Sequence, residues 1–340
     1  MLVYLKSVTI CLSLLACSLL KGNDQQLFKL HGYAQGTDYN ITYFAAEQLI
    51  SQQEVDNILL QLDSSMSLYK SYSLITQFNS SDGGIIMDRH FKAVIGKSFE
   101  VYNVSHGKFD ITVAPLVQLW GFGPVAITRF PDRLAIEKAL KNVGMNLIRI
   151  KGNKLIKVNP GVKIDLNGIA QGYSVDAVAR HLSSKGIIAF MVEIGGEICI
   201  RGPKPDGTAF TVGIEGPPEN SKGSPLLRKV ISLNQGAITT SGNYRKYLQS
   251  KNKRVSHLID PKTGYPLDTE MISATVYAKD AVTADGYDNV LMAMGADEAI
   301  RFVTARKDME AYLVYRKKDG TITDTLTNGF RKFIKDKSPE

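Results

Sequence analysis

The sequence contains very few cysteine residues. Only Cys11, Cys17 and Cys199 occur among 340 residues, and the first two fall in the N-terminal leader-like segment. Cys11 would be removed with the leader, and Cys17 would carry a lipid if the leader is the lipoprotein signal described below. Only Cys199 would then keep a free thiol, which excludes an intrachain disulfide. Cys199 lies in a Val/Ile-rich stretch, which favours a buried, unreactive thiol over a nucleophile.

The chain also lacks a concentrated basic tract and a long hydrophobic run. The formal charge is +8, but Lys and Arg are spread along the whole sequence without interleaved aromatic residues, so no nucleic-acid partner is expected. The apolar run from Val8 to Leu20 is too short to cross a bilayer as a helix. With 44% apolar and 22% charged residues, the composition is that of an ordinary globular protein.

The N-terminus has the pattern of an export signal. Lys6 precedes the apolar run, and the stretch Leu14-Leu15-Ala16-Cys17 resembles the lipobox that bacterial lipoprotein signal peptidase cuts before the cysteine. We therefore predict a signal peptide at 1–16, lipidation of Cys17, a tether at 17–27 and a folded domain at 28–335. The product would be an extracytoplasmic lipoprotein, anchored in the membrane of a bacterial cell envelope on its periplasmic side. The alternative is a cleaved secretory peptide that contains the cysteine by chance.

Hydrophobic periodicity predicts a mixture of strands and helices. Amphipathic helices are predicted at 51–66, 90–105, 131–143, 173–185 and 284–294. Strands are predicted at 32–45, 187–202, 210–217, 227–241, 273–280 and 309–316, with a hairpin from 147–150 and 155–158. Gly36 is expected to mark a bulge or a close approach within the first strand. Because the regular period of a doubly wound sheet is missing, the expected fold class is α+β.

Two segments combine carboxylates with turns. The segment from Gly107 to Pro124 sets Asp110 beside an apolar stretch with the only Trp, Trp120, which would suit a flat heteroaromatic ligand or would simply fill the core. The segment KIDLNGIAQGYSVD, residues 163–176, reads as a strand that ends in Asp165, a turn, and a helix whose N-terminus can receive an anion.

Two further segments carry hydroxyl groups, an arginine and a histidine. The segment TTSGNYRKY, residues 239–247, places hydroxyls near Arg245, a composition that can bind phosphate but that also fits an ordinary turn before a helix. In SHLIDPKTGYP, residues 256–266, His257 precedes a rigid turn, so it is either structural or a general base.

The segment TADGYDNVLMAMG, residues 283–295, carries oxygen ligands at helical spacing. If it is helical, Asp285, Asp288 and Asn289 fall at i, i+3 and i+4 and project from one face. Carboxylate and amide oxygens suit Mg²⁺ or Ca²⁺. The alternative is that these acids merely favour the helix N-terminus through the macrodipole.

Taken in order, the five segments resemble the FAD:protein FMN transferase family (ApbE type), from about Gly32 to Gly295. The resemblance implies two α+β parts with mixed or antiparallel sheets around a central flavin-binding cleft. It implies FAD contacts at Gln35, Tyr69, Lys108, Phe109, Asp110, Asp165, Gln171 and Ile259. It implies metal ligands at Gly168, through its carbonyl, and at Asp285, Asp288 and Asn289. The sequence departs from the family pattern at three of these positions, where Gln35 replaces Met, Gln171 replaces Lys or Glu, and Asn289 replaces Thr.

The activity that the resemblance implies is a Mg²⁺-dependent transfer of FMN from FAD to a Thr or Ser of an acceptor flavoprotein, with release of AMP. The acceptor would carry a Ser/Thr-Gly-Ala-Thr/Ser type motif. His257 is the candidate base, and Asp285 is the candidate catalytic acidic residue through its metal. Two alternatives stay open: a metal-dependent FAD pyrophosphatase that yields FMN and AMP, and a non-catalytic flavin-binding lipoprotein.

Overall fold

The computed structural model describes residues 25–335 except 218–225, 245–246 and 251–252. Its largest element is an eight-stranded sheet in the order β1-β2-β6-β7-β10-β13-β14-β15, with antiparallel pairing throughout. The strands are β1 (Gln26–Ala34), β2 (Thr37–Ala45), β6 (Ala189–Ile194), β7 (Glu197–Arg201), β10 (Gln235–Gly242), β13 (Met271–Ala278), β14 (Met309–Arg316) and β15 (Ile322–Leu326).

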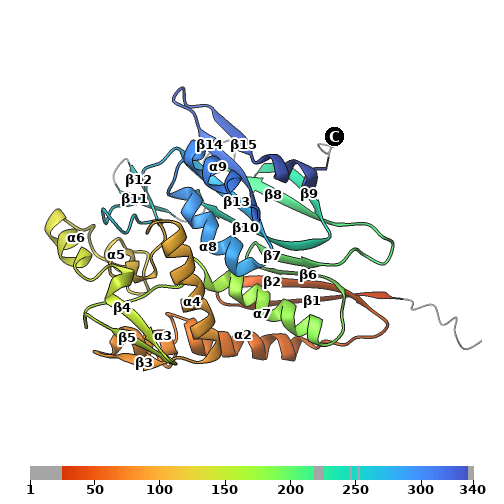
Figure 1. Ribbon diagram of the computed structural model, residues 1–340, viewed down its shortest axis with the longest axis horizontal. Coiled ribbons are helices and arrows are strands. Elements are labelled where there is room, and N and C mark those ends of the chain that lie inside the picture. The colour runs from red at the N-terminus through yellow and green to blue at the C-terminus, as the bar shows by residue number, and fades with distance from the viewer. Residues whose placement is uncertain (1–24, 218–225, 245–246, 251–252, 336–340) are drawn as a thin grey trace, which may run out of the picture.

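Helices cover one face of this sheet and a hairpin covers the other (Figure 1). The helical layer consists of α2 (Gln52–Met66), α4 (Arg89–Val104), α7 (Ala170–Ser184), α8 (Ala281–Met292) and α9 (Ala296–Thr304). The opposite layer consists of the hairpin β8 (Phe210–Gly216) and β9 (Leu226–Leu233) with η3 (Asn328–Phe333). Each face of the sheet therefore has its own hydrophobic core. Helices α7 and α8 both pack on the sheet and against each other, and α4 packs against α8.

A smaller part is built beside the helical layer, on the left in Figure 1. It contains a three-stranded antiparallel sheet in the order β3-β5-β4 and several short helical segments. Its elements are α3 (Leu74–Ser80), β3 (Gly84–Ile86), η1 (Ile111–Val113), α5 (Ala114–Leu119), α6 (Arg133–Leu140), η2 (Met145–Leu147), β4 (Ile148–Lys151), β5 (Lys154–Lys157), β11 (Tyr247–Ser250) and β12 (Lys253–Ser256). The α+β class with antiparallel sheets is confirmed.

The predicted helices are all present, and their ends shift by a few residues. The largest shift is three residues: α7 and α8 each begin three residues before the predicted start, and α6 ends three residues before the predicted end. The short helices α3, α5 and α9 were not predicted, and the predicted strand 227–241 is part of two strands, β9 and β10. Residues 210–216 form β8, as their strand pattern indicates.

The prediction of one strand across 32–45 is wrong. Residues 26–45 form a hairpin in which Ala34 pairs with Thr37, so the turn consists of Gln35 and Gly36 alone. Both turn residues have positive φ, 55° and 81°, as the tight hairpin turn that matches strand twist requires. Gly36 therefore marks a turn rather than a bulge.

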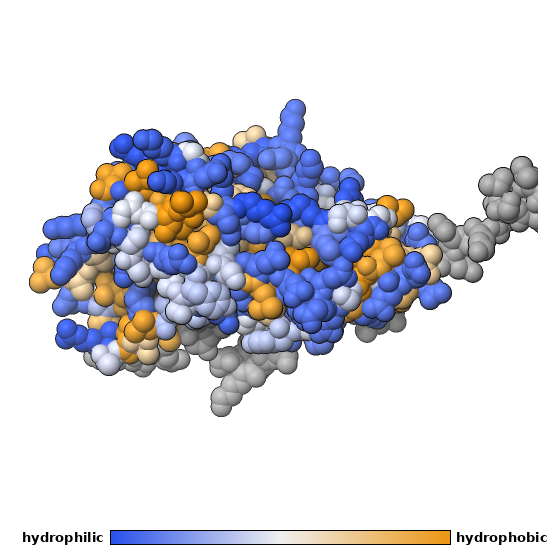
Figure 2. Space-filling model, turned by 90° about the horizontal axis from the view of Figure 1, so that it is seen from below, coloured by the Kyte–Doolittle hydropathy of each residue, from blue (hydrophilic) through white to orange (hydrophobic). Residues whose placement is uncertain are grey.

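The strand β1 begins at Gln26, two residues before the predicted start of the domain at 28. The predicted signal peptide and Cys17 lie outside the described residues. Among the residues that are described, no helix has the length and hydrophobicity to cross a membrane. Seen from below, the surface is largely polar, with separate hydrophobic patches (Figure 2).

Candidate functional site

The centre of the candidate site is the contact between α7 and α8. The backbone N–H of Gly172 in α7 donates to Oδ2 of Asp285 in α8, at 2.8 Å. A Cβ at Gly172 would overlap the carbonyl oxygen of Ala281 and lie 2.7 Å from Cβ of Asp285, so only glycine allows this approach. An anion was expected at the N-terminus of α7, and the Asp285 carboxylate of the same chain accepts a hydrogen bond there.

Asp285 and Asp288 form a buried acidic pair. Their exposed fractions are 4% and 1%, and no Lys or Arg in the described part of the chain lies within ion-pair distance of either. Burial raises the pKa of both carboxyl groups, and the charge of Asp285 raises the pKa of Asp288 further. Because α8 starts at Ala281, the pair lies beyond the first turn, where the helix macrodipole gives acids little support. Such a pair needs a proton or a cation nearby.

The side-chain amide of Asn289 lies where three oxygen atoms converge. Its amide nitrogen donates to the carbonyl oxygens of Gly168 (3.3 Å) and Asp285 (3.0 Å) and to Oδ1 of Asp288 (2.9 Å). Three oxygen atoms therefore converge on one electropositive group. Turning the amide over would present Oδ1 of Asn289 to the same point, and oxygen ligands of this kind suit Mg²⁺. The donor set fits a hard divalent cation.

The sequence segments that carry the site are joined by hydrogen bonds to the backbone. The N–H of Asp165 donates to the carbonyl of Ile111 at 2.7 Å, which joins the second segment to the first. The side chain of Asn79 holds Ile164 on both sides, donating to its carbonyl at 2.9 Å and accepting from its N–H at 2.7 Å. The segment with Tyr69 is thereby fixed to the segment that carries Asp165.

The ring of Phe109 lies against Gly168, one of the predicted metal ligands, and its two neighbours have partners elsewhere. A Cβ at Gly168 would be 3.4 Å from Cε2 of Phe109, so this ring borders the predicted metal ligands. Lys108 forms an ion pair with Glu298 at 3.5 Å. Asp110 is 8% exposed and accepts from the N–H and the hydroxyl of Thr112, which makes its carboxylate the cap of η1. Burial raises the pKa of Asp110.

A pocket of about 380 Å³ opens next to Asp110. Its lining residues come from the end of α4, the loop after it, the end of α6 and the turn that follows His257: Tyr102, Gly107, Asp110, Leu140, Val143, Gly144, Pro261 and Lys262. The Nζ of Lys262 donates to the carbonyl of His106 at 2.9 Å, so the first and fourth segments meet here.

Gln35 and Gln171 both lie beside the start of β2. The side chain of Gln171 donates to the carbonyl of Ile194 at 2.9 Å and fills the space beside Gly195 and Thr37. Gln35 precedes Thr37 by two residues, and its side chain hydrogen-bonds Asp63. Burial raises the pKa of the Asp63 carboxyl, and the hydrogen bond with Gln35 offsets part of this rise. Tyr69 is 68% exposed, so most of its side chain is accessible to a ligand.

The fourth segment forms a rigid turn around a small core. Ile259 is 9% exposed and packs in a cluster with Leu116, Trp120 and Ile136. The indole N–H of Trp120 donates to the carbonyl of Gly264 at 2.8 Å. The structure therefore favours the core-filling role of Trp120 over a role as ligand wall. His257 meets the ring of Phe122 edge-on, with ring centres 6.2 Å apart.

The third segment begins in a strand and continues into a turn at residues 243–244. The alternative of a turn before a helix is wrong in its helix, because Tyr247 begins the strand β11. Residues 239–242 belong to β10, because β13 supplies their ladder partners. The Ser241 hydroxyl donates to Oδ1 of Asn289 at 3.3 Å, which places β10 on the sheet side of the site. Arg245 lies outside the described residues.

With this geometry in place, comparison with known proteins is decisive. The sequence model of the ApbE family matches residues 35–313. The chain belongs to the ApbE family. A relative from Haemophilus influenzae named FAD:protein FMN transferase is 34% identical over 346 residues, covering 97% of each chain. A relative of the same name from Vibrio cholerae is 34% identical and covers 93% of this chain and 96% of its own.

Solved ApbE structures share the fold. The flavin transferase ApbE from Vibrio cholerae superposes with a TM-score of 0.82 at 32% identity, covering 91% of this chain and 99% of its own. The apo form of the Pseudomonas stutzeri flavinyl transferase ApbE gives 0.80 at 30% identity, covering 91% and 97%. The resemblance inferred from the five segments is confirmed.

Sequence reasoning missed three residues that support the site. Asp176 ends the second segment and was given no role, although an acid in an otherwise apolar helical stretch is a signal of a buried partner. Ser241 lies in the third segment, which was considered for phosphate rather than for Asn289. Asp63 lies on α2, and nothing in the sequence connects it with Gln35.

Proposed function

We propose that this chain is a Mg²⁺-dependent FAD:protein FMN transferase. The oxygen of an acceptor Thr or Ser hydroxyl attacks the phosphorus of the FMN half of FAD, the bond from that phosphorus to the AMP phosphate oxygen breaks, and AMP leaves. The hydroxyl proton passes to a base. The products are a phosphoester-linked FMN and AMP. Membership of the ApbE family and the buried Asp285–Asp288 pair support this proposal.

The predicted metal ligands fit Mg²⁺ on chemical grounds. The Gly168 carbonyl, both carboxylates and the Asn289 amide oxygen would hold it, leaving other positions for water and phosphate oxygens. When bound, Mg²⁺ supplies neutralisation of the negative charge on the pyrophosphate. The paired buried acids, with no Lys or Arg neighbour in the described part of the chain, carry this assignment.

The flavin would lie along residues that border the cation position. Phe109 and the exposed ring of Tyr69 offer flat apolar faces to the isoalloxazine, and Gln35, Lys108, Asp110, Asp165, Gln171 and Ile259 complete the predicted contacts. His257 is the proposed base that accepts the proton of the acceptor hydroxyl. Its ring is partly buried beside Phe122, which limits the orientations it can take.

The acceptor is proposed to be an extracytoplasmic flavoprotein with a Ser/Thr-Gly-Ala-Thr/Ser type motif. Cys17 would carry the lipid that keeps the enzyme on the periplasmic side of the membrane. Replacement of Cys17 by Ser should release the protein from the membrane fraction, and a mature N-terminus elsewhere than Cys17 would contradict lipidation.

The decisive experiment follows two products at once. The protein without residues 1–17 is incubated with FAD, Mg²⁺ and an acceptor domain that contains Ser-Gly-Ala-Thr, and acceptor mass and AMP are measured together. An FMN-sized gain in mass with equal AMP is expected. An acceptor whose Ser and Thr are both Ala is the control and should stay unlabelled. Release of AMP and free FMN without labelling would establish a pyrophosphatase instead, and neither product would indicate a flavin binder.

A further inference from the structure

Two carboxylates cap the first turn of α8, and only one of them is local. Asp280 is the ordinary N-cap, and its Oδ1 accepts from the N–H of Thr283 at 3.0 Å. Asp176 reaches over from α7, where its Oδ1 accepts from Ala281 N–H and its Oδ2 from Val282 N–H, both at 2.9 Å. The two carboxylates together satisfy three donors that a helix start leaves without intrahelical partners.

We propose that Asp176 is a positioning residue that fixes where α8 presents Asp285 and Asp288, an inference that rests on the proposed metal-dependent function. Asp176 is 6% exposed and touches only the backbone of α8 in these bonds. It therefore acts on the metal ligands through the placement of the helix.

The geometry of α7 makes the placement specific. Gly172 and Asp176 are four residues apart, so they lie on the same face of α7. Gly172 donates to Asp285 and leaves room for the backbone at Ala281, whereas Asp176 holds the two N–H groups at the start of α8. Because these two contacts lie one helical turn apart on α7, they fix both the rotation of α8 about its own axis and its position along α7.

The same helix also locates the remaining oxygen. Gly168 lies two residues before the first residue of α7, and its carbonyl accepts from Asn289 at 3.3 Å. The Gly168 carbonyl thus belongs to the α7 side of the joint, and the two carboxylates belong to the α8 side. The contact between α7 and α8 that Asp176 completes therefore determines the distance between the Gly168 carbonyl and the two carboxylates.

Burial of the Asp176 carboxylate costs desolvation free energy that a residue with only a packing role would not require. Burial raises its pKa to about 6, although the two backbone N–H groups favour the charged form. An apolar residue of similar size would avoid the desolvation of a carboxylate but would leave two N–H groups without acceptors. Both carboxylate oxygens are needed, because an Asn side chain has one acceptor and would turn its NH₂ group toward the second N–H.

The experiment compares Asp176→Asn with the control Asp280→Ala. Both variants remove capping contacts from the same helix start, but only the first removes contacts with α7. Mg²⁺ binding is measured by titration calorimetry, alongside the Mg²⁺ concentration for half-maximal FMN transfer and the free energy of unfolding. Asp176→Asn should raise the Kd for Mg²⁺ by about tenfold or more, as loss of supporting contacts around a metal site does. Asp280→Ala should change the Kd for Mg²⁺ by less than about twofold, even if it lowers the free energy of unfolding as much as Asp176→Asn does.

The outcomes separate this inference from the proposed function. A wild-type Kd in folded Asp176→Asn, or equal shifts in both variants, would overturn the positioning role and leave the transferase proposal intact. Absence of Mg²⁺ binding by the wild-type protein would overturn both. If Asp176→Asn does not fold, Asp176→Glu takes its place, because it keeps the charge and both oxygens one methylene further out. Its Kd should rise by about threefold or more, and an unchanged value would again overturn the inference.

Discussion

The backbone N–H groups in the first turns of α2 and α8 are capped in opposite ways. At α2, Ser51 accepts from the N–H of Glu54 at 3.2 Å and Glu54 accepts from the N–H of Ser51 at 2.9 Å, so the cap closes within four residues. At α8, Asp176 lies 105 residues before the N–H group of Ala281 that it binds. The first cap is local and solvent-exposed, and the second is tertiary and buried.

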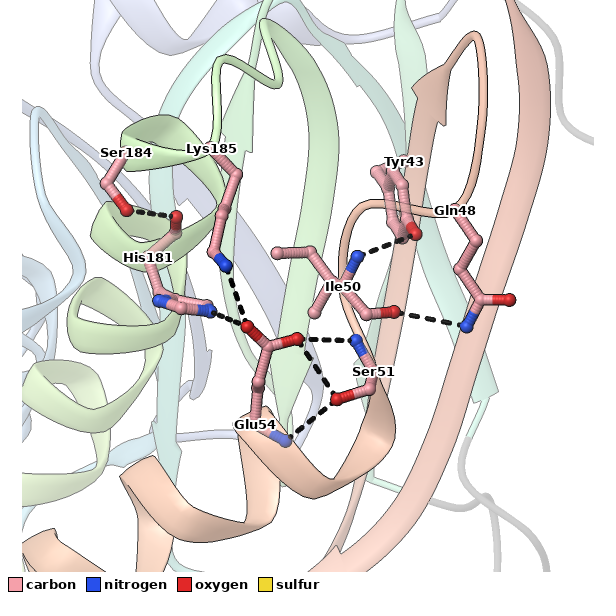
Figure 3. Close-up of polar contacts among 8 residues, drawn as sticks. All are labelled: Tyr43, Gln48, Ile50, Ser51, Glu54, His181, Ser184 and Lys185. Atoms are coloured by element: carbon pink, nitrogen blue, oxygen red, sulfur yellow. Dashed lines mark hydrogen bonds and ion pairs between the residues drawn. The ribbon is translucent and has the colours of Figure 1, made fainter.

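The difference decides which cap matters for function. Glu54 also pairs with Lys185 at 2.8 Å and with His181 at 3.5 Å, which fastens α2 to the end of α7 (Figure 3). These contacts lie at the surface, where ion pairs contribute up to about 1 kcal/mol. The contacts at α8 border the acidic pair, so small displacements there move the proposed metal ligands. We expect changes at α8 to affect activity first and changes at α2 to affect only stability.

The largest effect is expected from Asp285→Asn. The amide keeps the shape and the acceptor for Gly172 N–H but removes a charge from the proposed metal site. Turnover should fall by about a thousandfold, equal to about 4 kcal/mol, while FAD binding measured by flavin fluorescence persists. Stability without Mg²⁺ should be unchanged or higher, because a buried charge is lost. Unchanged turnover would contradict the metal role of Asp285.

A substitution at Gly172 should break the joint itself. In Gly172→Ala the new Cβ would overlap the Ala281 carbonyl, and α7 and α8 must separate. We expect the free energy of unfolding to fall by about 2–3 kcal/mol and Mg²⁺ affinity to fall with it.

Gly96→Ala in α4 is the matched control, because a Cβ there meets nothing within 4 Å. It should raise stability by about 0.5–1 kcal/mol and leave Mg²⁺ affinity as in the wild type. Equal effects of the two alanines in urea unfolding would show that close packing at Gly172 is unimportant.

The same contrast explains what the sequence could reveal. The helix at 51–66 was predictable because its apolar spacing and its Ser-x-x-Glu cap are written in neighbouring residues. The one-sided spacing of Asp285, Asp288 and Asn289 was likewise local. The order of five motifs gave the family, which the comparisons confirm.

Two kinds of feature could not be predicted in this way: a turn within a continuous alternating pattern, and contacts with distant partners. The hairpin turn at Gln35 and Gly36 looked like one continuous strand, because alternation of polar and apolar residues continues through a two-residue turn. The acceptors for Ala281 and Val282 come from α7, and no pattern near residue 281 indicates them. Trp120 was ambiguous because its partner, the Gly264 carbonyl, lies 144 residues away.

The smallest effect is expected from Glu54→Gln at the other helix start. Gln can still complete the capping box, so the substitution removes the charge and leaves the cap. Hydrogen bonds from Lys185 and from Ser51 lower the pKa of Glu54 from 4.5 to about 2. A lowered pKa means that the carboxylate stabilises the fold above pH 4.5 and that this contribution is lost as the pH falls toward 2. The wild type should therefore exceed the variant in stability at pH 7 by no more than about 1 kcal/mol.

Measurement of urea unfolding at several pH values tests this expectation. The difference between wild type and Glu54→Gln should shrink as the pH falls from 5 toward 2, and it should shrink at pH 7 in high salt, because the pair with Lys185 is exposed to solvent. Lys185→Gln is the matched partner, and the double variant should lose little more than either single one if the pair acts as a unit. FMN transfer should be unchanged in all three variants. Reduced transfer with intact Mg²⁺ binding would show that the surface contact between α2 and α7 also sets the geometry of the joint, which would remove the functional distinction between the two helix starts.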